Sequence, residues 1–420
     1  MTSESDNKKI INDPIYGFIS FPFGIHYEII EHPYFQRLRR INQLGLTNYV
    51  YPGANHTRFQ HALGTGHLMW QAIQVLRSKG IDINDIEAES VISAMLLHDI
   101  GHGPFSHSLE NSIISGINHE DLSHIFMNKL NKEFGGRLKT AIQIFNDEYH
   151  KRFLSQLVSG QLDMDRLDYL KRDSYFTGVT EGVVGSDRII KMLNVKDDEL
   201  VVDSKGIYSV EKFLVARRLM YWQVYLHKTV LSAEKLLINT LKRAKELSMR
   251  GEILFTTKAF GYFLNKTADK SDFKEGLSDE ALHYFSLMDD SDILISAKSW
   301  INHKDHVLSK LSYWLIHRKL YSIILQNKSF TSLEIKKVKE SIIRHYHIPE
   351  SEIDYFMPGG EICNMAYNSS DEKIKILQKN GSLKEIIFAS DIFDLPALSK
   401  TVKKYYLCYP KELKKHGIIP

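Results

Sequence analysis

The stretch that decides the fold is "LLHDIGHGPFSH", residues 96–107, which holds three histidines and an aspartate between positions 98 and 107. Histidines this dense are rarely packing residues, because each buried imidazole needs partners for two ring nitrogens. The segment leading into it, "NDIEAESVISAMLLHD" (residues 84–99), offers Asn84 or Asp85 as an N-cap, acids in its first turn and an almost unbroken apolar body. This pattern predicts a helix that is buried on nearly all sides and ends at His98 and Asp99.

Helical patterns dominate on both sides of this stretch. The preceding segment "HALGTGHLMWQAIQVLRSKG" (residues 61–80) predicts a helix that stops at Gly80. Its buried face would carry Ala62, Gly66, Met69, Ile73 and Leu76. Helical signals run from Glu28 to about residue 190, and a further long helix is expected from about Val210 to Leu247.

Short β-segments are expected in three places. A hairpin fits "KKIINDPIYGFISF" (residues 8–21), a second fits "ELVVDSKGIYSV" (199–210), and "KIKILQKNGSLKEIIF" (373–388) has a strand, Asn-Gly turn, strand pattern. The sequence therefore predicts a mostly α fold. A helical catalytic core with small β-hairpins would span residues 1–330, and a smaller α+β C-terminal lobe would span residues 331–420.

Composition excludes several classes of protein. The net charge of +3 is too small to argue for a nucleic-acid partner. The two cysteines, Cys363 and Cys408, cannot form a CxxC pair, which argues against a disulfide framework and a thiolate zinc site. The N-terminus "MTSESDNKKIIND" lacks the basic-then-apolar pattern of a signal peptide, and no run approaches a membrane span. We therefore expect a cytoplasmic protein with no membrane partner.

Histidine and aspartate side chains at helix positions suggest a metal site. His61, His98 and Asp99 sit on consecutive predicted helices, and "SGQLDMDRLDYLKRDSYF" (residues 159–176) adds Asp165. Two histidines and two aspartates with open positions suit Mg, Mn, Fe, Ni or Zn and leave room for an activated water. Taken singly, His61 and Asp165 would each favour an ordinary structural role, as a hydrogen-bonded histidine and a helix N-terminal charge.

Three motifs together resemble the HD-domain phosphohydrolases. They are "HTRFQHALG" (residues 56–64), "LLHDIGHGPFSH" (96–107) and "DMDRLDYLKRD" (163–173), and the resemblance runs from about Pro33 to Lys228. It points in particular to the deoxynucleoside triphosphate triphosphohydrolase branch, which includes the vertebrate SAM-and-HD-domain enzyme. This resemblance implies an all-α metal-binding core and hydrolysis of a deoxynucleoside triphosphate (dNTP) to the deoxynucleoside and inorganic triphosphate.

The resemblance also assigns metal and catalytic residues. The family's metal ligands match His61, His98, Asp99 and Asp165, and its pocket histidines match His102, His107 and His119. Glu110 stands where relatives have an acid three residues after the second pocket histidine. An acid one turn after His107 can orient its ring and raise its pKa, so that a protonated His107 could pass its proton to the leaving 5′-oxygen. Whether His107 acts as acid or nucleophile stays open.

Substrate contacts follow from the same resemblance. Arg58 and Arg166 lie beside metal ligands and suit bidentate phosphate contact, although Arg166 replaces a lysine of the vertebrate enzyme. Gln43 matches a sugar-contacting glutamine. In "SGQLDMDRLDYLKRDSYF", Tyr169 and Asp173 continue the i, i+4, i+8 stripe that begins at Asp165, and they match the family's deoxyribose contacts.

A second helix is expected to contact the nucleotide. In "ARRLMYWQVYLHK" (residues 216–228), Arg217, Tyr221 and Tyr225 follow an i, i+4, i+8 spacing. The alternative interpretation, in which these tyrosines are core residues, carries almost equal weight. Leu226 stands where the vertebrate enzyme has a base-contacting glutamine, so the base preference is left open.

A nucleotide activator is suggested near the N-terminus. "EHPYFQRLRR" (residues 31–40) resembles the family's guanine-nucleotide activator stretch, where Gln36 and Arg39 match and Glu31 replaces an aspartate. The alternative interpretation is a basic helix face at the surface or at a subunit contact.

The sequence as a whole predicts a metal-dependent dNTP triphosphohydrolase that forms a homo-oligomer, a dimer or tetramer. One alternative is an HD phosphohydrolase for another phosphoester, such as a nucleoside monophosphate or cyclic nucleotide. A second is a nucleic-acid-binding or scaffold protein with a relic HD site. The intact ligand set argues against a relic, and the near-neutral charge argues against a nucleic-acid binder.

Overall fold

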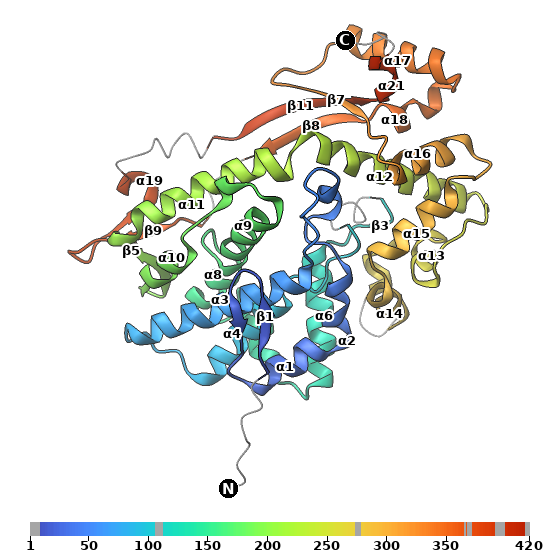
Figure 1. Ribbon diagram of the computed structural model, residues 1–420. Coiled ribbons are helices and arrows are strands. Elements are labelled where there is room, and N and C mark those ends of the chain that lie inside the picture. The colour runs from blue at the N-terminus through green and yellow to red at the C-terminus, as the bar shows by residue number, and fades with distance from the viewer. Residues whose placement is uncertain are drawn as a thin grey trace.

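The computed structural model describes residues 9–105, 112–273, 279–364, 367, 372–390 and 400–415. Figure 1 shows a helical body with some of the C-terminal strands along its top and others at its left. The fold is mostly α with small sheets, as the sequence predicts. Two residues with predicted catalytic roles, His107 and Glu110, lie outside the described residues.

The N-terminal half builds the centre of the helical body. A hairpin of β1 (Ile11–Asp13) and β2 (Gly17–Ile19) opens the chain, as predicted, with Gly17 at a positive φ of 74° in the turn. The helices that follow are α1 (Gly24–Glu31), α2 (Pro33–Gln36), η1 (Arg37–Arg40), η2 (Gly45–Tyr49), α3 (Arg58–Ser78), α4 (Asp85–Leu97), α6 (His119–Glu133), α7 (Lys139–Phe145), α8 (Arg152–Ser159) and α9 (Met164–Thr177).

Helix α4 lies in the middle of this body, packed against α1, α3 and α7. Its start is fixed by a capping box, in which the Asn84 side chain accepts from the Glu87 amide and the Glu87 carboxylate accepts from the Asn84 amide. Every residue from Val91 to Leu97 is buried. The apolar body therefore gives a central helix that is buried on all sides beyond its exposed first turn, and its C-terminal end delivers His98 and Asp99.

The next segment departs from the prediction for residues 199–210. After η3 (Thr180–Gly182) and α10 (Ser186–Met192), the hairpin pairs β4 (Leu193–Lys196) with β5 (Glu199–Asp203). Its two turn residues, Asp197 and Asp198, both have positive φ, which is the geometry of a two-residue hairpin turn. The residues expected to form the second strand instead enter η4 (Ser204–Gly206) and α11 (Ile207–Met220).

The helical stretch expected from about Val210 to Leu247 is present, but it is interrupted near its middle. Helix α11 passes into a π-turn, η5 (Tyr221–Tyr225). Leu226 and His227 then interrupt the helix before α12 (Lys228–Met249) begins. The His227 side chain caps α12 by accepting from the Thr229 amide. Single π-turns of this kind are often found at functional sites.

The remaining elements complete the helical body and add the C-terminal strands. Helix α16 packs on α12, as does strand β7. In chain order they are β3 (Ile114–Ser115), α13 (Lys258–Leu264), β6 (Ala268–Asp269), η6 (Lys270–Phe273), α14 (Asp279–Leu287), α15 (Asp290–Trp300), α16 (His306–Ile316), β7 (Ser322–Gln326), α17 (Ser332–Tyr346), η7 (Glu350–Glu352), α18 (Ile353–Phe356), β8 (Gly359–Asn364), β9 (Lys375–Leu377), β10 (Leu383–Glu385), α19 (Ile386–Ala389), β11 (Val402–Tyr409) and α21 (Lys411–Lys415).

Two sheets contain strands from both sides of residue 330. One has the order β7-β11-β8, and the other has the order β10-β9-β5-β4, in which β9 runs parallel to β5. The β9–β10 hairpin is the predicted strand, Asn-Gly turn, strand unit, with Gly381 at a φ of 82°. Strand pairing therefore ties the C-terminal segment directly to the helical core.

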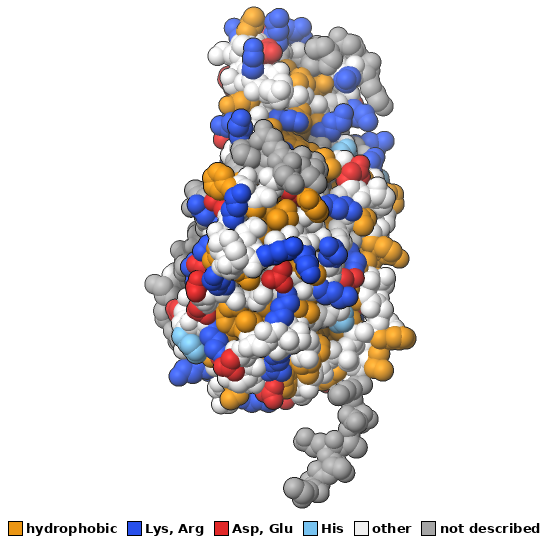
Figure 2. Space-filling model, turned by 90° about the vertical axis from the view of Figure 1, so that its left-hand side faces the viewer, with side chains coloured by type: hydrophobic (Ala, Val, Ile, Leu, Met, Phe, Trp, Pro, Cys, Tyr) orange, Lys and Arg blue, Asp and Glu red, His pale blue; other side chains and the backbone are white. Residues whose placement is uncertain are grey.

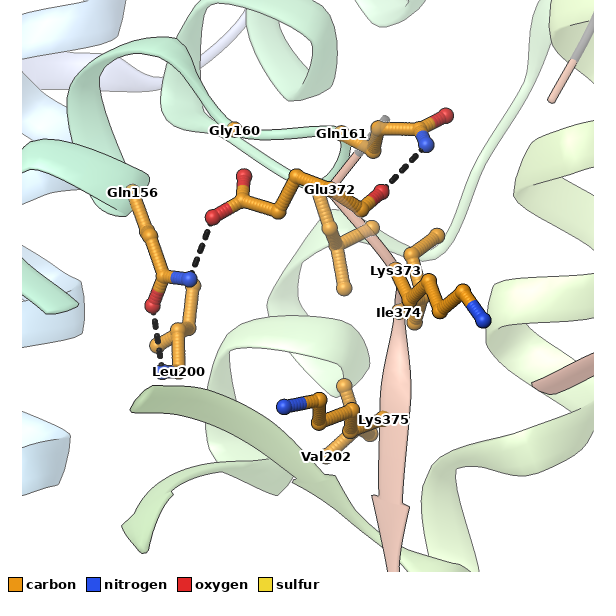
Figure 3. A pocket seen from close by; sticks show the side chains of 10 residues that line it. Gln156, Gly160, Gln161, Leu200, Val202, Glu372, Lys373, Ile374 and Lys375 are labelled. Carbon is orange, nitrogen blue, oxygen red and sulfur yellow. Dashed lines mark hydrogen bonds between the residues drawn. The ribbon is translucent and has the colours of Figure 1, made fainter. Parts of the chain in front are cut away.

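A water-sized cavity marks the contact of this segment with helix α8 (Figure 3). The Gln156 side chain donates to the Glu372 carboxylate, and the Gln161 side chain donates to the Glu372 backbone carbonyl. A Cβ at Gly160 would lie 2.8 Å from Glu372 Oε2, so a glycine is needed at this close approach. The C-terminal segment thus rests on the turn that leads into α9.

Charges on the face that carries β5 and β9 are mixed in sign. In Figure 2, basic and acidic side chains are interspersed on this face. Lys79 lies 2.8 Å from Asp203, Lys373 lies 3.1 Å from Glu385, and Lys375 pairs with Glu199. Among the described residues, no helix combines the length and apolarity that crossing a bilayer requires.

Candidate metal centre and adjoining pocket

Three helices bring the four predicted metal ligands to one point. His61 lies in the first turn of α3, His98 and Asp99 end α4, and Asp165 lies in the first turn of α9. Asp165 Oδ1 is 3.0 Å from His61 Nε2 and 3.6 Å from His98 Nε2. His98 Nε2 is 3.5 Å from Asp99 Oδ1, and one donor atom from each of His61, His98 and Asp99 lies within 4.8 Å of the others.

The chemistry of this cluster fits a divalent cation. His98 Nδ1 lies 2.7 Å from the Met95 carbonyl and His61 Nδ1 lies 2.7 Å from Asp168 Oδ2, so both rings aim Nε2 at the cluster. Both Nε2 atoms are buried, and His61 Nε2 lies within hydrogen-bonding distance of Asp165 Oδ1. Burial lowers the pKa of His61, but its hydrogen bonds to Asp165 and Asp168 outweigh burial and raise the pKa to about 10. The cluster therefore stabilises positive charge where a metal would bind.

Asp168 supports His61 from behind, and sequence reasoning missed it. Its carboxylate also accepts from Arg172 Nε at 2.8 Å and Nη2 at 3.0 Å, while Arg172 Nη1 donates to Asp13 Oδ2 at 2.8 Å. Burial raises the pKa of Asp168, but Arg172 and His61 lower it to about 2. A carboxylate that orients a metal-binding histidine is a common supporting group. The sequence did contain a signal for this residue, because Asp168 follows Asp165 by three residues and therefore lies one turn further along the same helix.

The loop after Asp99 is anchored by Arg37 and Ser123. Arg37 is fully buried and donates to the carbonyls of Ile100 at 2.7 Å and His102 at 2.8 Å. The Gly101 amide donates to Ser123 Oγ at 2.9 Å, and a Cβ at Gly101 would lie 2.2 Å from the His119 carbonyl. This close approach brings α6 against the loop.

Two of the predicted catalytic histidines meet beside the metal cluster. The rings of His102 and His119 stack with centroids 3.9 Å apart, and His102 Nε2 is 3.3 Å from Asp99 Oδ1. Burial and the nearby Arg58 lower the pKa of His102 to about 3, so this ring is neutral. A neutral His102 can take part in hydrogen bonds but is not a general acid.

A cavity of about 450 Å³ adjoins the cluster through Arg58. Arg58 pairs with Asp99 and also lines the cavity. The predicted substrate residues that line it with Arg58 are Gln43, Tyr169, Asp173, Tyr221 and Tyr225. The structure thus brings together residues that the sequence separates by almost 200 positions.

The aromatic side chains of the cavity pack edge to face. Tyr225 is 5.2 Å from Tyr221 and 6.0 Å from Tyr169, measured between ring centroids. The α-helical spacing that we assumed for Tyr221 and Tyr225 is wrong, because both belong to the π-turn η5. Its wider turn still leaves both rings on the cavity.

Comparison with known proteins gives the family. Residues 58–173 match the HD domain, and residues 184–254 match the HD associated region. The chain is 32% identical over 428 residues to uncharacterized protein YwfO of Bacillus subtilis (strain 168), covering 97% of this chain and 93% of that protein. A crystal structure of a phosphohydrolase from Bacteroides thetaiotaomicron superposes with a TM-score of 0.92 at 53% identity, covering 96% of this chain and 99% of that chain. The chain belongs to the HD-domain phosphohydrolases.

Relatives of this HD phosphohydrolase include proteins named deoxynucleoside triphosphate triphosphohydrolase. The SAMHD1 homolog of Dictyostelium discoideum is 31% identical over 61% of this chain and 54% of its own length. SAMHD1 of Gallus gallus is 30% identical over 53% of this chain and 43% of its own length. The family predicted from the three sequence motifs is confirmed.

Two of the predicted substrate-binding arginines of the HD phosphohydrolase, Arg166 and Arg217, differ in their surroundings. Arg166 pairs with Asp163 and donates to the Gly160 carbonyl at 2.6 Å, on a second cavity that also includes His98, Asp99 and Asp165. Arg217 has buried Nε and Nη1 atoms that make no hydrogen bond to any described residue. Arg217 is therefore the more available of the two for an anionic group.

The three predicted activator residues have different partners. Arg39 donates to Gln36 Oε1 at 2.8 Å, and its guanidinium lies 3.5 Å from the centre of the Phe59 ring. Glu31 instead pairs with Lys9. The structure thus joins Gln36 with Arg39 and gives Glu31 a different partner.

Proposed function

We propose that this HD phosphohydrolase hydrolyses dNTPs to the deoxynucleoside and inorganic triphosphate. One observation carries the proposal: Arg58 contacts the metal-binding Asp99 and also lines the tyrosine-rich cavity. A nucleotide in that cavity would therefore present its phosphates to the metal cluster. The similarity to proteins named dNTP triphosphohydrolases supports the substrate class.

The residues of the chain have separable roles in this reaction. His61, His98, Asp99 and Asp165 would hold a divalent metal, which lowers the pKa of bound water and stabilises charge on a phosphoryl oxygen. Arg58 and Arg217 would neutralise the triphosphate. Neutral His102 would take part in hydrogen bonds beside Asp99, with His119 stacked on it. Protonation of the leaving 5′-oxygen by His107, oriented by Glu110, stays a prediction from the sequence.

The experiment that tests this function is product analysis with isotopically labelled water. Purified protein is incubated with Mg, Mn, Fe, Ni or Zn and a panel of dNTPs, ribonucleoside triphosphates (NTPs), nucleoside monophosphates and cyclic nucleotides. We expect deoxynucleoside and intact triphosphate, with the ¹⁸O of the water in the triphosphate because attack occurs at the α-phosphorus. Pyrophosphate or orthophosphate as the first product would instead favour the alternative, an HD phosphohydrolase for another phosphoester. Asp99→Ala is the control for contaminating activity.

We further propose that the enzyme is a cytoplasmic homo-oligomer, a dimer or tetramer, with a guanine-nucleotide activator at Glu31, Gln36 and Arg39. Light scattering with and without GTP would report assembly. A lag in dNTP hydrolysis that GTP removes would report activation, and its loss in Arg39→Ala would locate the site.

A further inference from the structure

His56 is a buried histidine that the proposed mechanism does not use. It lies in the loop before α3 and is 1% exposed. Its ring stacks on Phe176 with centroids 4.5 Å apart and an interplanar angle of 16°. Buried imidazoles need polar partners, and the partner here is a residue of the nucleotide cavity.

The His56 side chain holds the carboxylate of Asp173. His56 Nε2 lies 2.7 Å from Asp173 Oδ1, while the Tyr225 hydroxyl donates to Asp173 Oδ2 at 2.7 Å. Asp173 is 1% exposed, and Asp173 and Tyr225 line the cavity while His56 does not. The carboxylate is therefore fixed from behind by His56 and from the side by Tyr225.

The His56 main chain holds a second residue of the same cavity. The main-chain N–H of Gln43 donates to the main-chain carbonyl of His56 at 3.0 Å. Gln43 Oε1 is buried and makes no hydrogen bond to any described residue, although it lines the cavity. One buried residue thus holds the Asp173 carboxylate and the main chain of Gln43, two residues that line the same cavity.

We propose that His56 is a positioning residue for recognition of the sugar 3′-hydroxyl, because it orients the Asp173 carboxylate through Nε2 and holds the main chain of Gln43 through its carbonyl. This inference rests on the proposed function, which places the deoxyribose beside Tyr169 and Asp173. A sugar hydroxyl can donate its single proton to the Asp173 carboxylate. Each carboxylate oxygen has two lone pairs, so Asp173 can accept from the sugar while it keeps both protein partners.

The chain offers a matched pair of variants at this position. In His56→Gln the amide nitrogen falls near the place of Nε2 and can still donate to Asp173. In His56→Asn the amide nitrogen falls near Nδ1, where it cannot reach the carboxylate. His56→Met fills the space beside Phe176 without any donor and serves if the asparagine variant fails to fold.

The test compares a dNTP with its 2′,3′-dideoxy counterpart, which lacks only the 3′-hydroxyl. Wild type should prefer the dNTP in kcat/KM by about ten- to a hundredfold, as expected for a hydrogen bond to a charged group. His56→Asn and His56→Met should lose most of this ratio, whereas His56→Gln should keep it. Because both substrates are assayed on one preparation, partial unfolding lowers both rates and leaves the ratio unchanged.

The outcomes separate this inference from the proposed function. A wild-type ratio in His56→Asn or His56→Met would overturn the positioning role while leaving the dNTP triphosphohydrolase intact. An equal loss of the dNTP preference in His56→Gln would also overturn the positioning role, since the glutamine amide restores a donor to Asp173 and should restore the preference. Absence of deoxynucleoside and triphosphate among the wild-type products would instead remove the proposed function itself.

Discussion

Asp99 contacts three other groups of the metal site at once. Its carboxylate pairs with Arg58 and lies 3.5 Å from His98 Nε2 and 3.3 Å from His102 Nε2. Burial raises the pKa of Asp99, but these positive and polar neighbours outweigh burial and hold its pKa well below the ordinary range. Asp99 is therefore ionised at neutral pH and can bind a cation.

Removing Asp99 should abolish metal binding and hydrolysis. Asp99→Ala deletes one of four ligands and the partner of Arg58, so we expect metal-free, inactive protein with the wild-type circular dichroism spectrum. Elemental analysis after dialysis measures the metal, and product formation measures turnover. Asp168→Asn is the graded control, because loss of a supporting carboxylate costs about ten- to a hundredfold in metal affinity. Wild-type metal content and turnover in Asp99→Ala would refute this site.

Tyr169 should discriminate against ribonucleotides. Its ring lies in the cavity, next to the Tyr225 and Asp173 that hold the sugar in the proposed complex. A ribose 2′-hydroxyl pressed against the ring would lose its hydrogen bonds, at about 1–3 kcal/mol, or roughly ten- to two-hundredfold in kcat/KM. We expect wild type and Tyr169→Phe to prefer dNTPs over NTPs by this factor in kcat/KM, and we expect Tyr169→Ala to show a smaller preference. Equal kcat/KM for ATP and dATP in wild type would end the argument.

At the scale of elements, the metal site depends on how closely α3 approaches α9. Gly64 of α3 lies at this contact, where a Cβ would lie 2.1 Å from Asp168 Oδ1 and 2.3 Å from Arg172 Nη2. These two side chains are the buried pair that orients His61. A glycine is therefore required at this helix contact for packing, because its absent side chain leaves room for the ion pair.

Gly64→Ala should weaken metal binding and stability together. The added methyl displaces Asp168 or Arg172, so we expect a loss of about 1–3 kcal/mol in the free energy of unfolding and a lower metal affinity by calorimetry. Gly24→Ala is the control, since a Cβ there meets nothing within 4 Å and a change within about 0.5 kcal/mol is expected. Wild-type metal affinity in Gly64→Ala would show that the Asp168–Arg172 pair does not tune the site.

At the scale of the whole molecule, buried His26 should make stability depend on pH. His26 joins α1 to α4 through Nε2, 3.1 Å from the Glu89 carbonyl, and it is fully buried. Burial lowers its pKa to about 4, although the hydrogen bond to Glu89 opposes this shift. Since the unfolded chain binds a proton near pH 6.5, the stabilisation is complete above about pH 6.5 and is lost as pH falls towards 4.

Urea unfolding at two pH values measures this effect. Between about pH 7.5 and about pH 5.5 the contribution of His26 to the free energy of unfolding should fall by about 1 kcal/mol. His26→Gln keeps a donor for the Glu89 carbonyl but does not titrate, so its pH dependence should be smaller by that amount. An identical pH dependence in both proteins would exclude His26 as a source.

The sequence by itself determined the fold class, several local elements and the family. The apolar run of residues 91–97 and the Asn84 cap fix α4, because helix start signals and burial patterns act over a few residues. The residue types and order of His61, His98, Asp99 and Asp165 were sufficient to identify the HD family. The β9–β10 hairpin followed from its Asn-Gly turn for the same local reason.

Only the tertiary structure decided which distant groups share a partner. His56 and Asp173 are 117 residues apart, and His61 and Asp168 are 107 apart, yet each pair is hydrogen-bonded at 2.7 Å. The π-turn η5 and the pairing of β9 with β5 were likewise invisible in local patterns. The physical reason is that such contacts are set by how helices and strands pack, and packing is cooperative over the whole core, whereas sequence periodicity records only neighbours along the chain.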